Sequence, residues 1–67
     1  MNVSVNGRPH PLEDGAPTVA SLVEAMALEG RRIAVELNGE IVPKSRYAVT
    51  RLADGDRLEI VGAVGGG

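Results

Sequence analysis

One stretch near the middle of the chain decides the fold: Ile33-Ala34-Val35-Glu36-Leu37-Asn38-Gly39-Glu40-Ile41-Val42-Pro43. In its first half, apolar residues at alternating positions predict a strand with residues 33, 35 and 37 facing the core. Asn38-Gly39 is a preferred pair for a two-residue hairpin turn, because both central positions require a positive φ. Ile41 and Val42 then form a returning strand that ends at Pro43. The stretch therefore predicts a β-hairpin.

A second hairpin is predicted at the start of the chain. Apolar and polar residues alternate over residues 1–5, Asn6-Gly7 is again a two-residue turn, and residues 8–12 form the returning strand. Pro9 and Pro11 lack backbone N–H groups, and residues two apart direct these groups to the same side of a strand. Because both prolines lie along one side, this strand is expected at the edge of a sheet.

One amphipathic helix is predicted between the two hairpins. Thr18 follows Pro17 and is well placed as the N-cap. Apolar residues then follow with the spacing i, i+3, i+4 and i+7 of one helix face, namely Val19, Leu22, Val23 and Met26. Gly30 is expected to stop the helix after Leu28.

The remaining third of the chain predicts a short helical turn near Tyr47, a turn at Asp54-Gly55-Asp56, and a final strand over residues 57–61. Leu58 and Ile60 of that strand face inward. The element order ββαβββ, with one helix available to cover one face of a mixed sheet, predicts an α+β domain. The geometry indicates a β-grasp: two hairpins around one main helix, with the first and last strands central. Residues 1–61 form this domain, and residues 62–67 are expected to form a flexible C-terminal tail.

Composition excludes several classes of protein. The chain has 67 residues, no cysteine and one histidine, so a disulfide or a structural zinc site is not expected. Its formal net charge is −2, with acidic and basic residues interspersed, which argues against a nucleic-acid partner. No apolar run is long enough to cross a membrane and no signal pattern opens the chain. A cytoplasmic protein with no membrane partner is therefore expected.

Side chains do not indicate a catalytic site. His10 is the only histidine of the chain and lies on the predicted edge strand. The serines therefore have no second histidine that could act as the base of a nucleophile–base pair. Asp54 and Asp56 flank a glycine between apolar segments, which is ordinary turn chemistry. The chain is therefore predicted not to be an enzyme and to bind no metal or cofactor itself.

The reactive group is instead expected at the tail, which ends Gly65-Gly66-Gly67. Glycine has no Cβ, so this segment fits channels that are too narrow for a side chain. A carboxylate becomes a good electrophile once it is joined to the α-phosphate of ATP, and a partner must supply the nucleotide pocket and magnesium. A frayed terminus is the alternative interpretation of these glycines.

The whole chain resembles the ThiS family of thiamine-biosynthesis sulfur carriers, which are ubiquitin-like β-grasp proteins. The resemblance lies in the hairpin and its continuation to Ser45, in residues 52–61, and in the ending Ala63-Val64-Gly65-Gly66-Gly67. The opening strand with Asn6-Gly7 and the helix start at residues 18–22 fit the same pattern. Tyr47 stands where the family usually carries Trp, and Lys44 where it often carries Arg.

The resemblance implies a function for the terminal residue. An E1-like adenylating enzyme of the ThiF type would activate the Gly67 carboxylate with ATP and magnesium. A persulfide sulfur donor, such as a cysteine desulfurase, would convert it to a thiocarboxylate, and a ThiG-type thiazole synthase would use the sulfur. By this interpretation Gly67 is the reacting residue, Gly66 and Gly67 enter the partner's narrow channel, and Val64 and the end of the strand anchor the interface. Gly65 belongs to the same partner-binding segment, as a spacer before the diglycine.

Three alternatives remain open at this point. The small subunit of molybdopterin synthase is also a β-grasp sulfur carrier with a Gly-Gly ending. A ubiquitin-like modifier would join its terminus to lysines of other proteins. A plain binding module would function without Gly66 and Gly67.

Overall fold

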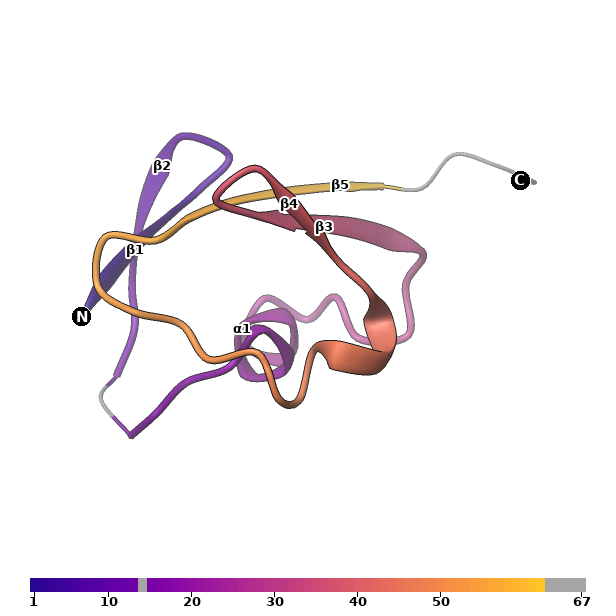
Figure 1. Ribbon diagram of the computed structural model, residues 1–67, viewed down its shortest axis with the longest axis horizontal. Coiled ribbons are helices and arrows are strands. Elements are labelled where there is room, and N and C mark those ends of the chain that lie inside the picture. Colours follow the sequence, from indigo (N-terminus) through magenta and orange to yellow (C-terminus); the bar gives the residue numbers. More distant parts are fainter. Residues whose placement is uncertain (14, 63–67) are drawn as a thin grey trace.

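The computed structural model describes residues 1–13 and 15–62, so Asp14 and residues 63–67 lie outside the described residues. Seven elements follow one another along the chain (Figure 1). They are the strands β1 (Asn2–Val5) and β2 (Arg8–Pro11), the helix α1 (Val19–Ala25), the strands β3 (Ile33–Leu37) and β4 (Glu40–Val42), the 3₁₀ helix η1 (Lys44–Arg46) and the strand β5 (Arg57–Gly62).

The five strands form one mixed sheet in the order β2-β1-β5-β3-β4. Strands β1 and β5 are parallel, whereas the other neighbouring pairs are antiparallel. The first and last strands are therefore central, and the proline-containing β2 lies at an edge, as the sequence predicts. The α+β class and the β-grasp architecture are confirmed.

Both Asn-Gly turns have the backbone that the sequence requires. The φ angles are 53° at Asn6 and 81° at Gly7, and 52° at Asn38 and 88° at Gly39. Positive φ at both central positions matches the right-handed twist of the flanking strands, so each turn returns the chain into its own hairpin. These two turns fix the registers of β1 with β2 and of β3 with β4.

Helix α1 covers one face of the sheet, and the segment between β4 and β5 passes beside it (Figure 1). Leu22 and Leu58 are the largest side chains fully buried between the helix and the sheet. The core contains almost only aliphatic side chains, namely Val3, Val5, Val19, Leu22, Val23, Val35, Val42, Leu52, Leu58 and Ile60. Tyr47 is the one aromatic residue of this core, and burial raises the pKa of its hydroxyl above the ordinary value.

The N-terminus of α1 is capped as expected, although the partner residue is unusual. The Thr18 hydroxyl accepts a hydrogen bond of 3.1 Å from the Ser21 backbone N–H, and the Ser21 hydroxyl accepts one of 2.8 Å from the Thr18 N–H. Serine thus occupies the position that Glu or Gln takes in most capping boxes. Two backbone donors that the helix leaves without partners are satisfied in this way.

The predicted end of α1 is wrong. The helix ends at Ala25, with Met26 as C-cap, and not after Leu28 in front of Gly30. Ala27 takes the left-handed conformation with φ 58°, its N–H donates to the Glu24 carbonyl, and the Leu28 N–H donates to the Val23 carbonyl. This bonding pattern is a Schellman motif with alanine at the position that glycine usually occupies. The early stop has a physical reason, because it brings Leu28 against the core.

We expect Ala27→Gly to stabilise the protein by about 0.5–1 kcal/mol. An L-residue pays roughly 1–2 kcal/mol for the left-handed conformation, and glycine avoids this while it adds some unfolded-state entropy. Urea unfolding of the variant measures the change. Ala25→Gly is the matched control, since it places glycine at the last regular helical position and should destabilise by up to about 1 kcal/mol. A loss of stability in Ala27→Gly would contradict the assigned cap.

Strand β5 runs one residue further than the sequence predicts. Gly62 pairs with Ile33 of β3 and is therefore part of the strand, not of the tail. The division of the chain into a domain and a flexible tail otherwise stays a prediction, because residues 63–67 lie outside the described residues.

Candidate functional site at the end of strand β5

Strand β5 leads directly into the residues predicted to react. Gly67, Gly66, Gly65 and Val64 all lie outside the described residues, so the structure defines the strand that precedes them. β5 is the central strand of the sheet, between β1 and β3. The position at which it ends therefore depends on how these two neighbours hold it.

On the β3 side, β5 is paired from Leu58 to its last residue. The register runs from Leu37 opposite Leu58 to Ile33 opposite Gly62. On the β1 side the pairing is shorter. The Ser4 N–H donates to the Asp56 carbonyl at 2.9 Å and the Asn6 N–H donates to the Leu58 carbonyl, also at 2.9 Å. The backbone of β1 then turns away at Asn6-Gly7.

The side chain of Asn6 continues the interaction where the backbone of β1 stops. Its Nδ2 donates to the Ile60 carbonyl at 2.9 Å, and its Oδ1 accepts from the Ile60 N–H at 2.7 Å. The amide group thus takes the place of the next residue of a parallel strand. Both backbone groups of Ile60 on this side are satisfied, which avoids a cost of roughly 1–3 kcal/mol for each group that burial leaves unpaired.

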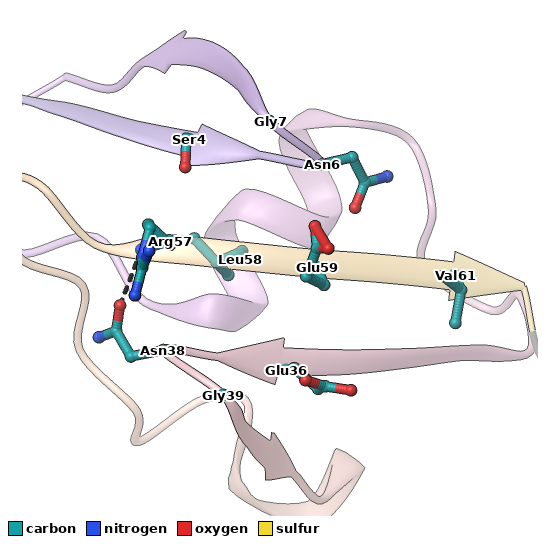
Figure 2. Close-up of a pocket in the computed structure, with 10 residues that line it drawn as sticks. All are labelled: Ser4, Asn6, Gly7, Glu36, Asn38, Gly39, Arg57, Leu58, Glu59 and Val61. Atoms are coloured by element: carbon teal, nitrogen blue, oxygen red, sulfur yellow. Dashed lines mark hydrogen bonds between the residues drawn. The ribbon is translucent and has the colours of Figure 1, made fainter.

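Asn38 holds the other end of β5 in a similar way. Its Oδ1 accepts from the Arg57 N–H at 2.9 Å, as the dashed line in Figure 2 marks. Its Nδ2 donates to Asp56 Oδ1 at 3.0 Å, and its own N–H donates to the Arg57 carbonyl at 2.7 Å. The asparagines of the two hairpin turns therefore hold β5 near its start and near its end.

Charged and polar side chains lie on the sheet face opposite α1, where they line a groove (Figure 2). Ser4, Arg57 and Glu59 alternate along β1 and β5 with the buried residues of the other face. Glu36 of β3 lies directly opposite Glu59. Like charges at directly opposed positions destabilise a strand pair. This face is therefore open and charged, in contrast to the apolar face under α1.

A second pocket lies beside the end of β5. Its apolar lining comes from the segment after α1 and from the adjoining strands, namely Met26, Leu28, Ile33, Ile60, Val61 and Gly62. Arg31 and Arg32 also line it, and Asn6 lines both this pocket and the groove on the open face. The Asn6 side chain thus stands between the two hollows that flank the last residues of β5.

The two aspartates considered as candidate site residues have structural roles. Asp54 Oδ1 accepts a 2.7 Å hydrogen bond from the Asn2 N–H, and Asp56 Oδ2 accepts one of 2.8 Å from the Ala53 N–H. These contacts confirm the interpretation of Asp54-Gly55-Asp56 as a turn. His10 lies in the edge strand opposite Val3.

The described residues contain neither a cluster of metal-ligating side chains nor a helix that could cross a membrane. Over residues 1–13 and 15–62, no three His, Asp or Glu side chains come close enough together to hold a metal ion. Within the same ranges, no helix has the length and hydropathy needed to cross a membrane.

The paired hydrogen bonds of Asn6 with Ile60 could not be predicted from the sequence. Asn6-Gly7 is a sufficient turn signal by itself, so nothing in it indicates a second role for the side chain. The residue that it contacts is 54 positions away in the chain. Only the parallel pairing of the first and last strands brings the two together.

The fold and this site define a class: a small β-grasp protein whose central strand is held on both sides and leads directly into a glycine-rich segment. The ThiS family model matches residues 3–67. The chain therefore belongs to the ThiS family, as the resemblance of its motifs predicts.

Individual relatives agree with this assignment. The chain is 37% identical to the sulfur carrier protein ThiS of Bacillus subtilis, with 97% of this chain and 98% of that protein covered. It is also similar to the crystal structure of the thiamine biosynthesis protein ThiS from Geobacter metallireducens. That comparison gives a TM-score of 0.85 at 33% identity and covers both chains completely.

A further similarity is to part of a larger protein. All 67 residues align at 43% identity with a thiazole synthase of Paramagnetospirillum magneticum, and at 33% with one of Magnetococcus marinus. The chain spans 20% of the length of each of these two relatives. In them, a ThiS-like segment is thus part of the same polypeptide as the rest of a thiazole synthase.

Proposed function

We propose that this chain is the sulfur carrier of thiamine biosynthesis, and that the carboxylate of Gly67 carries the sulfur. The observation that supports the proposal most strongly is the match to the ThiS family, which extends over residues 3–67 and so includes the terminal glycines. The geometry agrees with a carrier, since the central strand of the five-stranded sheet precedes these residues.

The proposed chemistry begins with activation of the carboxylate. A Gly67 oxygen attacks the α-phosphate of ATP in a ThiF-type, E1-like adenylating enzyme, and magnesium pyrophosphate leaves. A persulfide, supplied by a donor such as a cysteine desulfurase, then attacks the acyl carbon and displaces AMP. A second thiol then attacks the donor's sulfur atom and forms a disulfide with it, which breaks the sulfur–sulfur bond to the acyl group and leaves a thiocarboxylate on Gly67. ATP and magnesium belong to the partner enzyme in this scheme, and this chain binds neither.

The protein itself acts as a carrier and co-substrate, not as a catalyst. The titratable residues singled out from the sequence support this part of the proposal, since Asp54 and Asp56 are engaged in turn hydrogen bonds. We also propose a cytoplasmic location, because the activating reaction consumes ATP.

We propose a ThiG-type thiazole synthase as the sulfur acceptor. Two thiazole synthases contain a segment that aligns with this entire chain. Joining two domains in one polypeptide raises their effective concentration, which favours a pair that must meet in each catalytic cycle. In the present chain, Val64, Gly65 and Gly66 would carry Gly67 into the acceptor's active site.

Intact mass spectrometry tests the proposal. The purified chain is incubated with an adenylating enzyme of the ThiF type, ATP, magnesium and a persulfide source. The expected product has one oxygen replaced by sulfur, and fragmentation locates the replacement at Gly67. A reaction without ATP is the control. An unchanged mass, with the enzyme shown to be active on another carrier, would refute a sulfur carrier and favour a modifier or a binding module.

A further inference from the structure

Within the described residues, Ile60 is the last residue of β5 that is hydrogen-bonded from the β1 side of the sheet, and its partner is the side chain of Asn6. Within the described residues, Val61 and Gly62 pair only with β3, through Ala34 and Ile33. Ile60 is therefore the last residue of β5 held from both sides. On the β1 side it is held by the Asn6 side-chain amide alone, through hydrogen bonds of 2.9 and 2.7 Å. Any change in that amide alters how the end of β5 is held.

The paired end of β5 is the last part of the sheet before the residues predicted to react. Gly67 follows Ile60 by seven positions in the sequence, so Ile60 is the last described residue before it that both neighbouring strands hold. Misplacement of a reacting group by about 1 Å can lower a rate by a hundredfold.

We infer that Asn6 is a positioning residue for the reaction at Gly67: its side chain sets the direction in which β5 presents the terminal residues to a partner enzyme. This inference rests on the proposed function. Asn6 acts through the backbone of Ile60 and does not contact the reacting atoms. Asn6 lies on a hairpin turn, which suits this role because the turn holds its backbone in place. The φ angle at Asn6 is 53°, and its backbone N–H donates to the Leu58 carbonyl.

The test compares Asn6→Gly with Asn38→Gly. Both asparagines have nearly the same positive φ, 53° and 52°, so glycine leaves either turn unstrained. Each substitution removes two side-chain hydrogen bonds at one end of β5. Only Asn6 lies at the end from which the predicted reactive residues follow. Asn38→Gly is therefore the matched control for a general loss of stability.

The first readout is the steady-state rate of pyrophosphate release by the adenylating enzyme. For Asn6→Gly we expect kcat to fall about tenfold with KM changed less than about twofold, because docking is retained and the geometry of attack is lost. For Asn38→Gly we expect both constants to stay within about twofold of the wild type. Equal effects of the two substitutions on kcat, or an effect of Asn6→Gly on KM alone, would overturn the inference.

The second readout does not depend on any partner. Amide hydrogen exchange is measured at Ile60 in the wild type and in both variants. We expect exchange at Ile60 to be at least tenfold faster in Asn6→Gly and nearly unchanged, relative to global stability, in Asn38→Gly. If the wild type is not adenylated at all, the proposed function is wrong. If it is adenylated while Ile60 exchanges alike in both variants, the role of Asn6 is wrong and the function stands.

Discussion

Replacing Gly67 with isoleucine is expected to abolish sulfur loading, with at least a hundredfold lower rate of thiocarboxylate formation. A β-branched side chain next to the carboxylate crowds both a narrow channel and the carbonyl that must be attacked. One residue added after Gly67 has the same expected effect, because it moves the carboxylate beyond its reaction position. Intact mass after incubation with the adenylating enzyme, ATP and a persulfide source measures the loss.

The melting temperature of each variant distinguishes this expected loss of sulfur loading from misfolding. The core of the described residues is formed by α1, the sheet and two residues between β4 and β5, Tyr47 and Leu52, and its buried residues include nothing after Ile60. The melting temperatures of both Gly67 variants should therefore equal that of the wild type within about 2 °C. Ser45→Ile, which adds the same side chain at an exposed position of η1, is the control and should load sulfur normally. A large drop in melting temperature for the Gly67 variants would contradict the expected position of the tail outside the core.

Leu22→Ala is expected to have the largest effect on stability. The Leu22 side chain is 0% exposed and lies between α1 and the sheet. Truncation of a buried leucine to alanine costs about 3–5 kcal/mol, from lost burial and from the cavity that remains. A domain of this size has a total stability of roughly 3–10 kcal/mol, so the variant should be largely unfolded or close to it.

Urea unfolding followed by circular dichroism measures this effect. Val49→Ala is the control, because Val49 is 65% exposed and its truncation should change the free energy of unfolding by less than about 0.5 kcal/mol. If Leu22→Ala lost less than about 1 kcal/mol, the helix would not be packed as described. The variant also tests whether the carrier needs a folded body, since its tail is unchanged.

Much of the fold could be predicted because several residues permit only one local structure. Asn6-Gly7 and Asn38-Gly39 take the left-handed backbone of a hairpin turn, and few other pairs do so without strain. Pro9 and Pro11 cannot donate hydrogen bonds, and β2 is indeed at the edge of the sheet. The family resemblance, which depended on the order and spacing of these motifs, is confirmed by the match over residues 3–67.

The end of the helix could not be predicted, because it depends on a tertiary contact. Local propensity favours glycine at the left-handed position, and Gly30 was the nearest glycine that could take this role. The chain instead turns at Ala27, where the early stop brings Leu28 to the core. The site was only partly predictable for a similar reason. The tail is visible in the sequence, whereas the contact of Asn6 with Ile60 exists only in the folded sheet.

The two turn asparagines also determine how this protein ages chemically. An asparagine followed by glycine loses its side-chain amide when the next backbone nitrogen attacks the side-chain carbonyl, which leaves aspartate or isoaspartate. In the folded chain, the amides of Asn6 and Asn38 are engaged with Ile60, Arg57 and Asp56, which restrains them from turning toward that nitrogen. Folding thus slows the deamidation of the asparagines that hold β5, and each transient opening of the sheet end exposes them to an irreversible change. A stored sample is therefore expected to lose the side-chain N–H donors of Asn6 and Asn38, and with them the hydrogen bonds to the Ile60 carbonyl and to Asp56.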